Sequence, residues 1–470
     1  MTAEGLAAAV AKMRRHDCSQ SEIDGFTHSY QLFDSGVTGM IPESSIAPLP
    51  DPPRSADVAE DAGAEALRRT AVLKLNGGLG TSMGLAAAKT LLPVREGLTF
   101  LDLIVEQVRA ARKAYDVPLP LLFMNSFRTR DDTLARLASH RDLPVPGIPL
   151  DFLQSQYPKV REDDSTPVSW PADPEKEWCP PGHGEVFAQL AASGILAALL
   201  DGGYRYLSLS NGDNLGAAPS APLAGWFASS GAPFAVEVCE RTANDRKGGH
   251  LAVRRSDGRV ILRELSQTPA EDAEAFMDAS RHRFFNTNNL WVDLVALRAL
   301  MQVRGTHLGL PLIKNRKTVD PADPASIPVI QLETAMGAAV EVFEGATAIQ
   351  VDRSRFLPVK TTNELLLIRS DLFGLAADGR LVATRDSLPR VDLDPKHYQV
   401  LSEFEQRIPL PPSLSGADRL RIRGDVTFGA GVVVSGDVDI EVSVPTDVPA
   451  GAVLDGAALA TGEPLPTVAR

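Results

Sequence analysis

The chain has 470 residues, of which 44% are hydrophobic and 23% charged, and its formal net charge is −13 at pH 7. This length allows about two to four domains, and the composition is that of a globular protein rather than a disordered or fibrous one. The acidic balance, with no concentrated basic stretch, excludes nucleic acid as an expected partner.

The cysteines and the apolar runs indicate the compartment. Cys18, Cys179 and Cys239 are too few and too widely spaced for a disulfide framework or a metal site. Apolar runs stay well short of the length that crosses a bilayer, and the N-terminal residues lack the features of a signal peptide. The sequence therefore predicts a cytoplasmic protein without a membrane partner.

Residues 1–70 are predicted to form an N-terminal helical region. A helix is expected from Leu6 to Arg15, followed by a proline-rich acidic connector over residues 49–64 and a short helix. We expect this region to serve packing rather than chemistry.

The stretch from Ala71 to Val94 (AVLKLNGGLGTSMGLAAAKTLLPV) is the main functional signal. Its apolar run, Val72–Leu75, predicts a buried strand that leads into a glycine-rich segment, residues 76–84. Glycines let the backbone approach a ligand, and the free N–H groups of such a turn suit a phosphate. The spacing differs from the P-loop and from the dinucleotide fingerprint. The alternative is a turn needed only for close strand packing.

From Val72 onward, short apolar runs alternate with helical patterns, which predicts an α/β fold. The predicted strands are Val72–Leu75, Pro120–Met124, Tyr204–Ser210, Phe234–Val238 and Leu251–Val253. The predicted helices are Phe100–Ala111, Arg130–Ala138, Val186–Leu200 and Ala270–Ala279. Ligands of open α/β sheets bind beyond the carboxyl ends of the strands. The candidate positions are therefore the glycine-rich loop, residues 124–126, residues 210–214 and the loop after Val238.

The residue pattern of the sequence changes beyond Pro412. Gly-Asp-Val occurs at Gly424 and again at Gly436, and a similar pattern continues from Val448. Short repeats of this kind predict a small β-helix of stacked coils. This segment favours scaffolding or self-association over catalysis.

Two residues after predicted strands or turns suit phosphate chemistry. Asp213 can hold Mg²⁺ when phosphate oxygens complete the shell, although an aspartate that caps a turn is the alternative. His183 lies in the rigid turn WCPPGHG and can donate a hydrogen bond to a phosphate. A buried histidine bonded to a carbonyl is the alternative there.

Polar residues also follow the later predicted strands. Glu264 and the amides of residues 286–289 are the groups that read sugar hydroxyls. Lys360 ends the most cationic stretch of the second half, residues 352–360. Together with Lys89 and Lys247, it could neutralise a triphosphate and a sugar phosphate.

Nine blocks of the chain resemble the eukaryotic-type UTP–glucose-1-phosphate uridylyltransferase (UDP-glucose pyrophosphorylase) family. In order, they are KLNGGLGTSMG, GLTFLDLIVEQV, MNSF, QSQYPKV, PPGHGEV, SNGDNLGA, FFNTNNLWVDL, VIQLETAMGAA and SRFLPVK. The resemblance implies a GT-A-like, Rossmann-related nucleotidyltransferase domain over residues 71–395. It also implies a C-terminal left-handed β-helix over residues 396–470, a candidate for homo-oligomer contacts. The chain departs from the family pattern at Ala86–Ala88, just before Lys89.

The reaction that the resemblance implies is UTP plus glucose 1-phosphate giving UDP-glucose and pyrophosphate, with Mg²⁺. The sugar phosphate oxygen is already a nucleophile, so in-line positioning and charge neutralisation at the α-phosphate suffice without a general base. The alternatives are a pyrophosphorylase for another hexose 1-phosphate and a catalytically inactive nucleotide-sugar sensor.

The resemblance also implies roles for individual residues. The nucleotide site would comprise Leu75, Asn76, Gly77 and Gly78, with Gln154 and Gly182 at the uracil end and Asn211 and Asp213 between nucleotide and metal. The sugar-phosphate site would comprise His183, Lys247, Gly249, Glu264 and Asn288. Lys89 and Lys360 would be catalytic, contacting the phosphates that exchange, and Asp213 would be the metal ligand.

Overall fold

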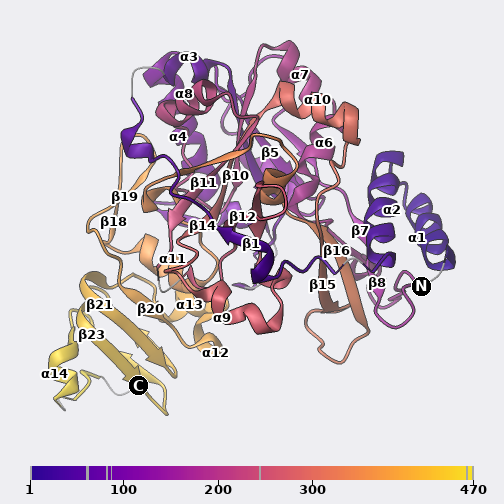
Figure 1. The fold of residues 1–470 in the computed structure, drawn as a ribbon. Coiled ribbons are helices and arrows are strands. Elements are labelled where there is room, and N and C mark those ends of the chain that lie inside the picture. Colours follow the sequence, from indigo (N-terminus) through magenta and orange to yellow (C-terminus); the bar gives the residue numbers. More distant parts are fainter. Residues whose placement is uncertain are drawn as a thin grey trace.

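A mixed sheet forms the centre of the molecule (Figure 1). The computed structural model describes residues 3–36, 38–59, 63–80, 83–85, 87–242, 245–461 and 464–467. Over these residues the main sheet has ten strands, with the order β1-β12-β14-β10-β2-β5-β6, and β11, β13 and β17 branch from this path. The fold is thus of the α/β class that the sequence predicts.

Parallel strands occupy one half of this sheet. They are β10 (Tyr206–Asn211), β2 (Thr70–Asn76), β5 (Leu121–Asn125) and β6 (Asp151–Leu153). Strand β2 is buried on both faces, as parallel strands usually are, and Val72 packs in one core while Leu73 packs in the other. Because the strands run the same way, their carboxyl ends meet at one edge.

The other half of the sheet is largely antiparallel. Its long strand β14 (Phe284–Asp293) pairs with β10 and with β11 (Phe234–Glu240). The further strands are β12 (His250–Arg254), β13 (Val260–Arg263), β1 (Ile46–Pro48) and β17 (Thr347–Gln350), the last of which runs parallel to β11. A bulge interrupts the pairing of β11 with β14, since Glu237 lies opposite Asn289 whereas Val238 lies opposite Asn286.

Helices cover both faces of the sheet (Figure 1). One core contains residues of α3 (Gly63–Arg68), α4 (Phe100–Tyr115) and α8 (Ala221–Ser230). The opposite core contains residues of α6 (Val186–Ala192), α7 (Ile195–Asp201) and α10 (Leu294–Arg304). In the described part of the chain, no single helix has the length and apolarity of a membrane span. The helical segments 183–192 and 195–201, which are bent relative to each other, have this length and composition only when taken together.

The five predicted strands and two of the predicted helices are confirmed, the helices as α4 and α5 (Arg130–Leu137). The single helix predicted over Val186–Leu200 is wrong, because Gly194, at φ 77°, separates α6 from α7. The helix predicted over Ala270–Ala279 is also wrong in extent: a 3₁₀ turn, Ala270–Asp272, precedes a short α9 (Ala273–Met277).

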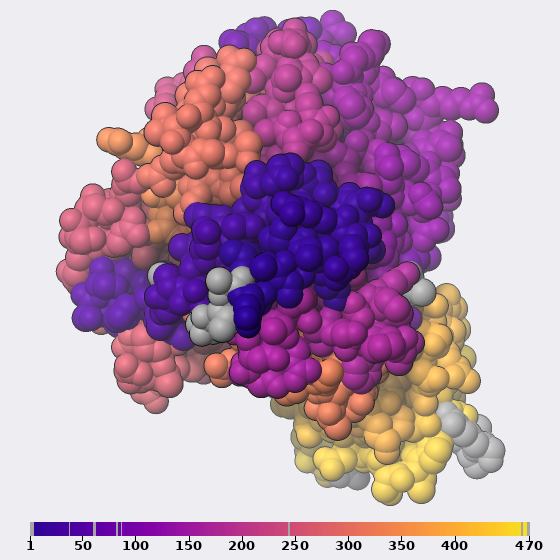
Figure 2. Space-filling model, turned by 90° about the vertical axis from the view of Figure 1, so that its right-hand side faces the viewer, coloured from indigo at the N-terminus to yellow at the C-terminus, as the bar shows by residue number. Residues whose placement is uncertain are grey.

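The N-terminal region contains more than the predicted helices. After α1 (Ala3–Arg15) comes the unpredicted α2 (Gln20–Asp34), which starts at a capping box of Ser19 and Glu22. Helix α2 packs against the hairpin of β15 (Leu312–Thr318) and β16 (Pro328–Thr334), and α1 packs against α2 and β7 (Tyr157–Pro158). Figure 2 shows this indigo segment lying across one face of the molecule. Strand β1, also from residues 1–70, joins the central sheet by pairing with β12.

Parallel strands stack at the C-terminus, in the yellow part of Figure 1. They are β20 (Arg390–Asp392), β21 (Ser413–Arg423), β23 (Val433–Glu441) and β25 (Val453–Asp455), with β22 (Val426–Phe428) and β24 (Thr446–Val448) as a second pair. The two Gly-Asp-Val motifs do not mark successive coils, since Val426 pairs with Thr446 and Val438 with Leu420. Strand β20 shows that this stack begins before residue 396.

The remaining elements are shorter connections between these layers. They are β3 (Pro93–Arg95), β4 (Leu98–Thr99), β7 (Tyr157–Pro158), β8 (Val160–Arg161), β9 (Trp178–Cys179), β18 (Phe373–Leu375), β19 (Leu381–Ala383), α11 (Thr362–Arg369), α12 (Pro395–Tyr398), α13 (Leu401–Arg407) and α14 (Gly456–Ala460). Short 3₁₀ turns also occur, among them His183–Glu185, Lys89–Leu91, Arg353–Arg355 and Met336–Glu341.

Candidate active site

Several of the predicted site residues lie at the carboxyl edge of the sheet. Strands β2 and β10 end side by side there, with Leu75 in register with Asn211. The N–H of Gly212 donates to the carbonyl oxygen of Leu75 at 2.8 Å. A Cβ on Gly212 would lie 2.8 Å from that same oxygen, which explains why a small residue stands at this position. Asn211 is half-buried at this edge.

Three residues of the predicted nucleotide site lie together. The side-chain amide of Gln154 donates to the carbonyl oxygen of Gly182 at 3.2 Å. A Cβ on Gly77 would lie 2.4 Å from Oε1 of Gln154, and a Cβ on Gly182 would lie 2.4 Å from the carbonyl oxygen of Thr334. Gly182 also has φ 80°, which favours glycine. Glycine at position 77 therefore lets the glycine-rich loop approach Gln154, and glycine at position 182 lets the WCPPGHG turn approach the backbone of Thr334.

The side chain of Asn76 is occupied inside the protein. It is buried, and its Nδ2 donates to Asn125 and to Thr133, both at 2.8 Å. Its Oδ1 accepts from the hydroxyl of Thr90 at 2.6 Å. Asn76 therefore orders the loop with its side chain and can offer a nucleotide only its backbone. Leu75 is half-buried and Gly78 is exposed, while Thr81, Ser82 and Ala86 lie outside the described residues.

Lys89 and Asp213 meet at the same edge. Nζ of Lys89 lies 2.8 Å from Oδ2 of Asp213, and both side chains are largely buried. Within the described ranges, no three His, Cys, Asp or Glu side chains gather as a metal site. Asp213 already faces the ammonium group of Lys89, so its surroundings accept a cation. A single carboxylate fits Mg²⁺ when phosphate oxygens and water supply the other ligands.

Gly249 and Glu264 form part of the predicted sugar-phosphate site. A Cβ on Gly249 would lie 2.5 Å from the Glu264 carboxylate, so only glycine allows this approach. Burial raises the pKa of Glu264, and the positive charges of Lys360 and Arg241 offset part of this rise. Lys360 therefore acts on this carboxylate although its own side chain is exposed. Lys247 is exposed as well, on the loop that precedes Gly249.

His183 is a neutral hydrogen-bond donor. Its Nδ1 accepts a hydrogen bond from the backbone N–H of Met336 at 2.9 Å, so the partner is an N–H rather than the carbonyl of the alternative interpretation. Burial lowers the pKa of His183 to about 4, which leaves the ring neutral at pH 7. The proton of the neutral ring is then on Nε2, which can donate to a ligand.

The bulge in β14 sets the position of Asn288. Asn288 has φ 57°, a left-handed conformation that asparagine tolerates. Its Oδ1 accepts from Nδ2 of Asn286 at 2.8 Å, and its N–H donates to Oδ1 of Asn286 at 2.9 Å. Gly337 lies beside both amides, and a Cβ there would lie 2.9 Å from Nδ2 of Asn286. The bulge thus leaves Asn288 outside the regular pairing of β14 with β11.

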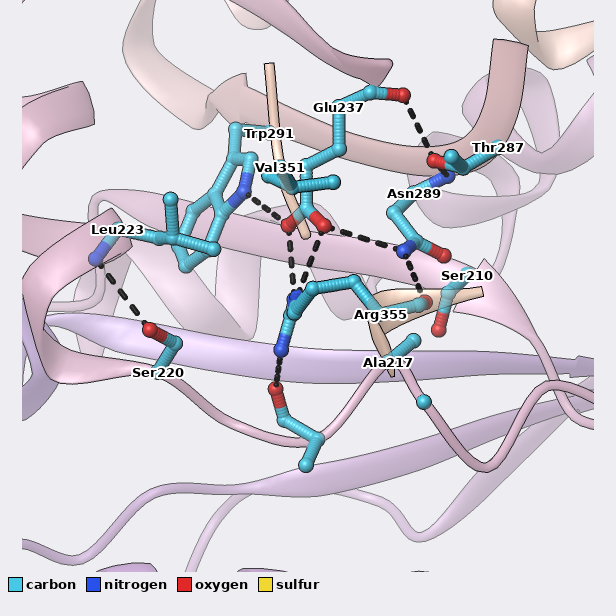
Figure 3. Close-up of polar contacts among 12 residues, drawn as sticks. Ser210, Ala217, Ser220, Leu223, Glu237, Thr287, Asn289, Trp291, Val351 and Arg355 are labelled. Atoms are coloured by element: carbon cyan, nitrogen blue, oxygen red, sulfur yellow. Dashed lines mark hydrogen bonds and ion pairs between the residues drawn. The ribbon is translucent and has the colours of Figure 1, made fainter. Parts of the chain in front are cut away.

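A buried charged network below this edge was missed by the sequence analysis (Figure 3). Glu237 binds Arg355 through two hydrogen bonds, and Trp291 donates to the same carboxylate. Lys74, fully buried in β2, donates to Ser210 at 2.8 Å and to the carbonyl oxygen of Ala217 at 2.7 Å. The available signal was a charge in the interior of each apolar strand, Lys74 in TAVLKLN and Glu237 in FAVEVCE, whose second glutamate, Glu240, is at the exposed end.

The stability of the protein is expected to depend on Lys74 between pH 7 and pH 9. Burial, and secondarily Arg355, lowers the pKa of Lys74 from 10.5 to about 7. In this range the unfolded chain therefore binds the extra proton, so raising the pH favours the folded state. We expect the unfolding free energy of the wild type to rise relative to that of K74M by roughly 1 kcal/mol per pH unit. Urea unfolding of both proteins at three pH values between 7 and 9 measures this difference in unfolding free energy. A difference that stays constant with pH would contradict the prediction.

Comparison with known proteins places these features in a family. The model of the UTP–glucose-1-phosphate uridylyltransferase family matches residues 24–435. The chain is 39% identical to the barley (Hordeum vulgare) UTP–glucose-1-phosphate uridylyltransferase, over 96% of this chain and 95% of that protein. It is 42% identical to the Saccharomyces cerevisiae protein of the same name, over 83% of this chain and 77% of that one.

Solved structures agree with this relationship. A UDP-glucose phosphorylase from Trypanosoma brucei superposes with a TM-score of 0.90 and 41% identity, over 96% of this chain and 98% of that one. A UDP-glucose pyrophosphorylase variant from Leishmania major, solved in complex with UDP-glucose, has a TM-score of 0.90 and 40% identity, over 97% and 99% of the two chains. The chain therefore belongs to the UTP–glucose-1-phosphate uridylyltransferase family.

Proposed function

We propose that this chain makes UDP-glucose and pyrophosphate from UTP and glucose 1-phosphate. A phosphate oxygen of the sugar phosphate attacks the α-phosphorus of UTP, and the bond from that phosphorus to the β-phosphate oxygen breaks in line with the attack. The observation that carries the proposal is the pairing of Lys89 with Asp213 at the carboxyl edge, beside the glycine cradle of Gly77, Gln154 and Gly182. The family membership supports the same reaction.

We assign the residues by their placement around this edge. The cradle of Gly77 and Gly182 with Gln154 takes the nucleotide base, with Leu75, Asn76, Gly78 and Asn211 nearby. Glu264, Asn288, Gly249 and Lys247 receive the sugar phosphate, and the neutral His183 donates to it from Nε2. Lys89 and Lys360 neutralise the phosphates that exchange, which is the main demand of phosphoryl chemistry.

Asp213 is the residue that would hold Mg²⁺. One carboxylate in surroundings that already accept a cation fits this ion, as described above. When bound, Mg²⁺ supplies positive charge to the phosphate oxygens, the same service that the lysines provide. Lys89, which pairs with Asp213, would then be free to turn toward a phosphate.

The wider architecture is proposed on the same basis. We interpret residues 1–70 as an N-terminal region and residues 71–395 as a GT-A-like catalytic domain. Residues 396–470, together with β20, are interpreted as a left-handed β-helix, supported by the parallel stacking there. Two exposed valines, Val433 and Val453, lie in register on this stack and support a role in self-association. Three free cysteines support a cytoplasmic location.

A substrate panel tests the proposed function. Pyrophosphate release is measured with UTP and Mg²⁺ against glucose, galactose and N-acetylglucosamine 1-phosphates. We expect glucose 1-phosphate to be favoured by about 10-fold or more in kcat/KM, because a hydrogen-bonding pocket rejects a misplaced hydroxyl. A preference for another sugar phosphate would make the chain a pyrophosphorylase for that substrate. Release with none of them would favour the inactive sensor.

A further inference from the structure

The segment from Asp352 to Lys360 connects β17 to α11 and crosses the carboxyl edge of the sheet. Its last residue, Lys360, is exposed, and its charge acts on Glu264. A lysine at the end of an exposed segment reaches a fixed point only if the backbone before it is held. The contacts of this segment are therefore informative about how Lys360 is placed.

The side chain of Arg355 anchors the segment from below (Figure 3). Its Nε lies 3.0 Å from Oε2 of Glu237, its Nη2 lies 2.8 Å from Oε1, and its Nη1 donates to the carbonyl oxygen of Ala218 at 2.5 Å. Glu237 is 1% exposed and also accepts from Nε1 of Trp291 at 2.9 Å and Nδ2 of Asn289 at 3.1 Å. The ion pair is thus buried, bidentate and hydrogen-bonded on all sides, which gives it a single geometry.

Asn214 holds the backbone of the same segment from the side. Its Nδ2 donates to the carbonyl oxygen of Arg355 at 3.1 Å and to Oδ1 of Asn289 at 3.0 Å. Its Oδ1 accepts from the N–H of Leu357 at 2.8 Å and from that of Gly216 at 3.1 Å. Every donor and acceptor of this amide is used.

The backbone contacts of the segment continue to Val359, the residue before Lys360. The N–H of Val359 donates to the carbonyl oxygen of Asp213 at 3.3 Å, and Pro358 forms a β-bridge with Asn214. Alternate residues of the segment are therefore bonded to the loop that carries Asp213. This loop also presents the carboxylate that pairs with Lys89.

We propose that Arg355 and Asn214 are positioning residues that hold Lys360 at the phosphates. The inference rests on the proposed catalytic role of Lys360 and goes beyond it by naming the groups that fix its place. Arg355 does not reach the substrate, because Nε, Nη1 and Nη2 of its guanidinium all donate hydrogen bonds to Glu237 or to the carbonyl oxygen of Ala218. Its effect on turnover must therefore pass through Lys360, since a displacement of about 1 Å at a reacting centre can cost about 10²-fold in rate.

A double-mutant cycle separates positioning from stability. The variants are R355K, K360A and the combination, each measured for kcat, for KM of both substrates and for thermal unfolding. R355K keeps the charge opposite Glu237 but loses the planar fork. We expect it to lower kcat about 10-fold in the wild-type background and less than about 2-fold in the K360A background, with KM for UTP nearly unchanged. R161K is the matched control, because Arg161 makes a bidentate pair with Asp163 on the exposed surface.

The outcomes of the cycle test the catalytic role of Lys360 separately from the positioning role of Arg355 and Asn214. A loss from R355K that persists undiminished in K360A would overturn the inference and leave the role of Lys360 intact. A K360A variant with wild-type kcat would overturn the role of Lys360 and the inference with it. If R355K fails to fold, the same cycle is run with N214A, which frees the backbone of the segment but leaves the Arg355–Glu237 pair in place. Coupling of N214A to K360A supports the inference, and additivity overturns it.

Discussion

Replacing Lys360 with alanine is expected to lower kcat for UDP-glucose formation by about 10²-fold or more, the usual cost of losing one preorganised electrostatic group. The exposed side chain of Lys360 has little packing to lose, so the fold should remain intact. Glu264 would lose one of the two positive charges that counter the effect of burial on its pKa. The sugar-phosphate side of the site would then be more negative when phosphate binds.

The measurement is steady-state pyrophosphate release at saturating UTP and glucose 1-phosphate, with circular dichroism as a check on folding. Lys113, an exposed lysine near the end of α4, provides the matched control K113A, which should keep wild-type turnover. Unchanged turnover in K360A would remove Lys360 from the catalytic residues and would leave Lys89 as the cation to investigate.

Replacing Asp213 with asparagine is the second change with a large expected effect. The substitution keeps the shape of the side chain but removes the negative charge that pairs with Lys89 at 2.8 Å and that would hold Mg²⁺. We expect kcat/KM to fall by about 10²-fold or more, and activation to require a higher Mg²⁺ concentration than in the wild type. Both effects have the same physical cause, the loss of the carboxylate from the carboxyl edge.

Initial rates across a Mg²⁺ titration test this prediction, and direct Mg²⁺ binding in the presence of UTP gives a readout independent of turnover. Asp116 supplies the control, since D116N keeps a residue that tolerates its left-handed conformation at the end of α4. An unshifted Mg²⁺ dependence in D213N would assign the ion to other ligands. The pair of Lys89 and Asp213 would then serve only to order the loop.

Local patterns predicted five of the ten strands described in the main sheet, because these strands are short, apolar and bounded by turn residues. Val72–Leu75 and Phe234–Val238 were identifiable for that reason, and both lie in the central sheet. The helix over Val186–Leu200 was predicted too long because apolar residues lie on both sides of Ser193 and Gly194. The backbone turns left-handed at Gly194, which ends one helix before the next begins. Hydrophobicity alone does not reveal such a break, whereas the glycine does.

The sequence predicts the candidate site as a set of residues but does not show their contacts. The motif blocks indicated Gly77, Gln154 and Gly182. Only the structure shows that, without side chains, Gly77 approaches Gln154 and Gly182 approaches the backbone of Thr334. The pairing of Lys89 with Asp213 was not anticipated either, since sequence analysis gave the two residues separate roles. These contacts join segments that are distant in the chain.

The sequence by itself determined the α/β class, five strands of the main sheet and the family resemblance, and it predicted the candidate site residues, because each follows from local pattern or from motif order. Only the tertiary structure decided which charges meet. Arg355 and Glu237 are 118 residues apart, and nothing local shows that one neutralises the other in the core. A buried charge requires a partner, and the partner is chosen by the packing of the sheet rather than by the neighbours in the chain.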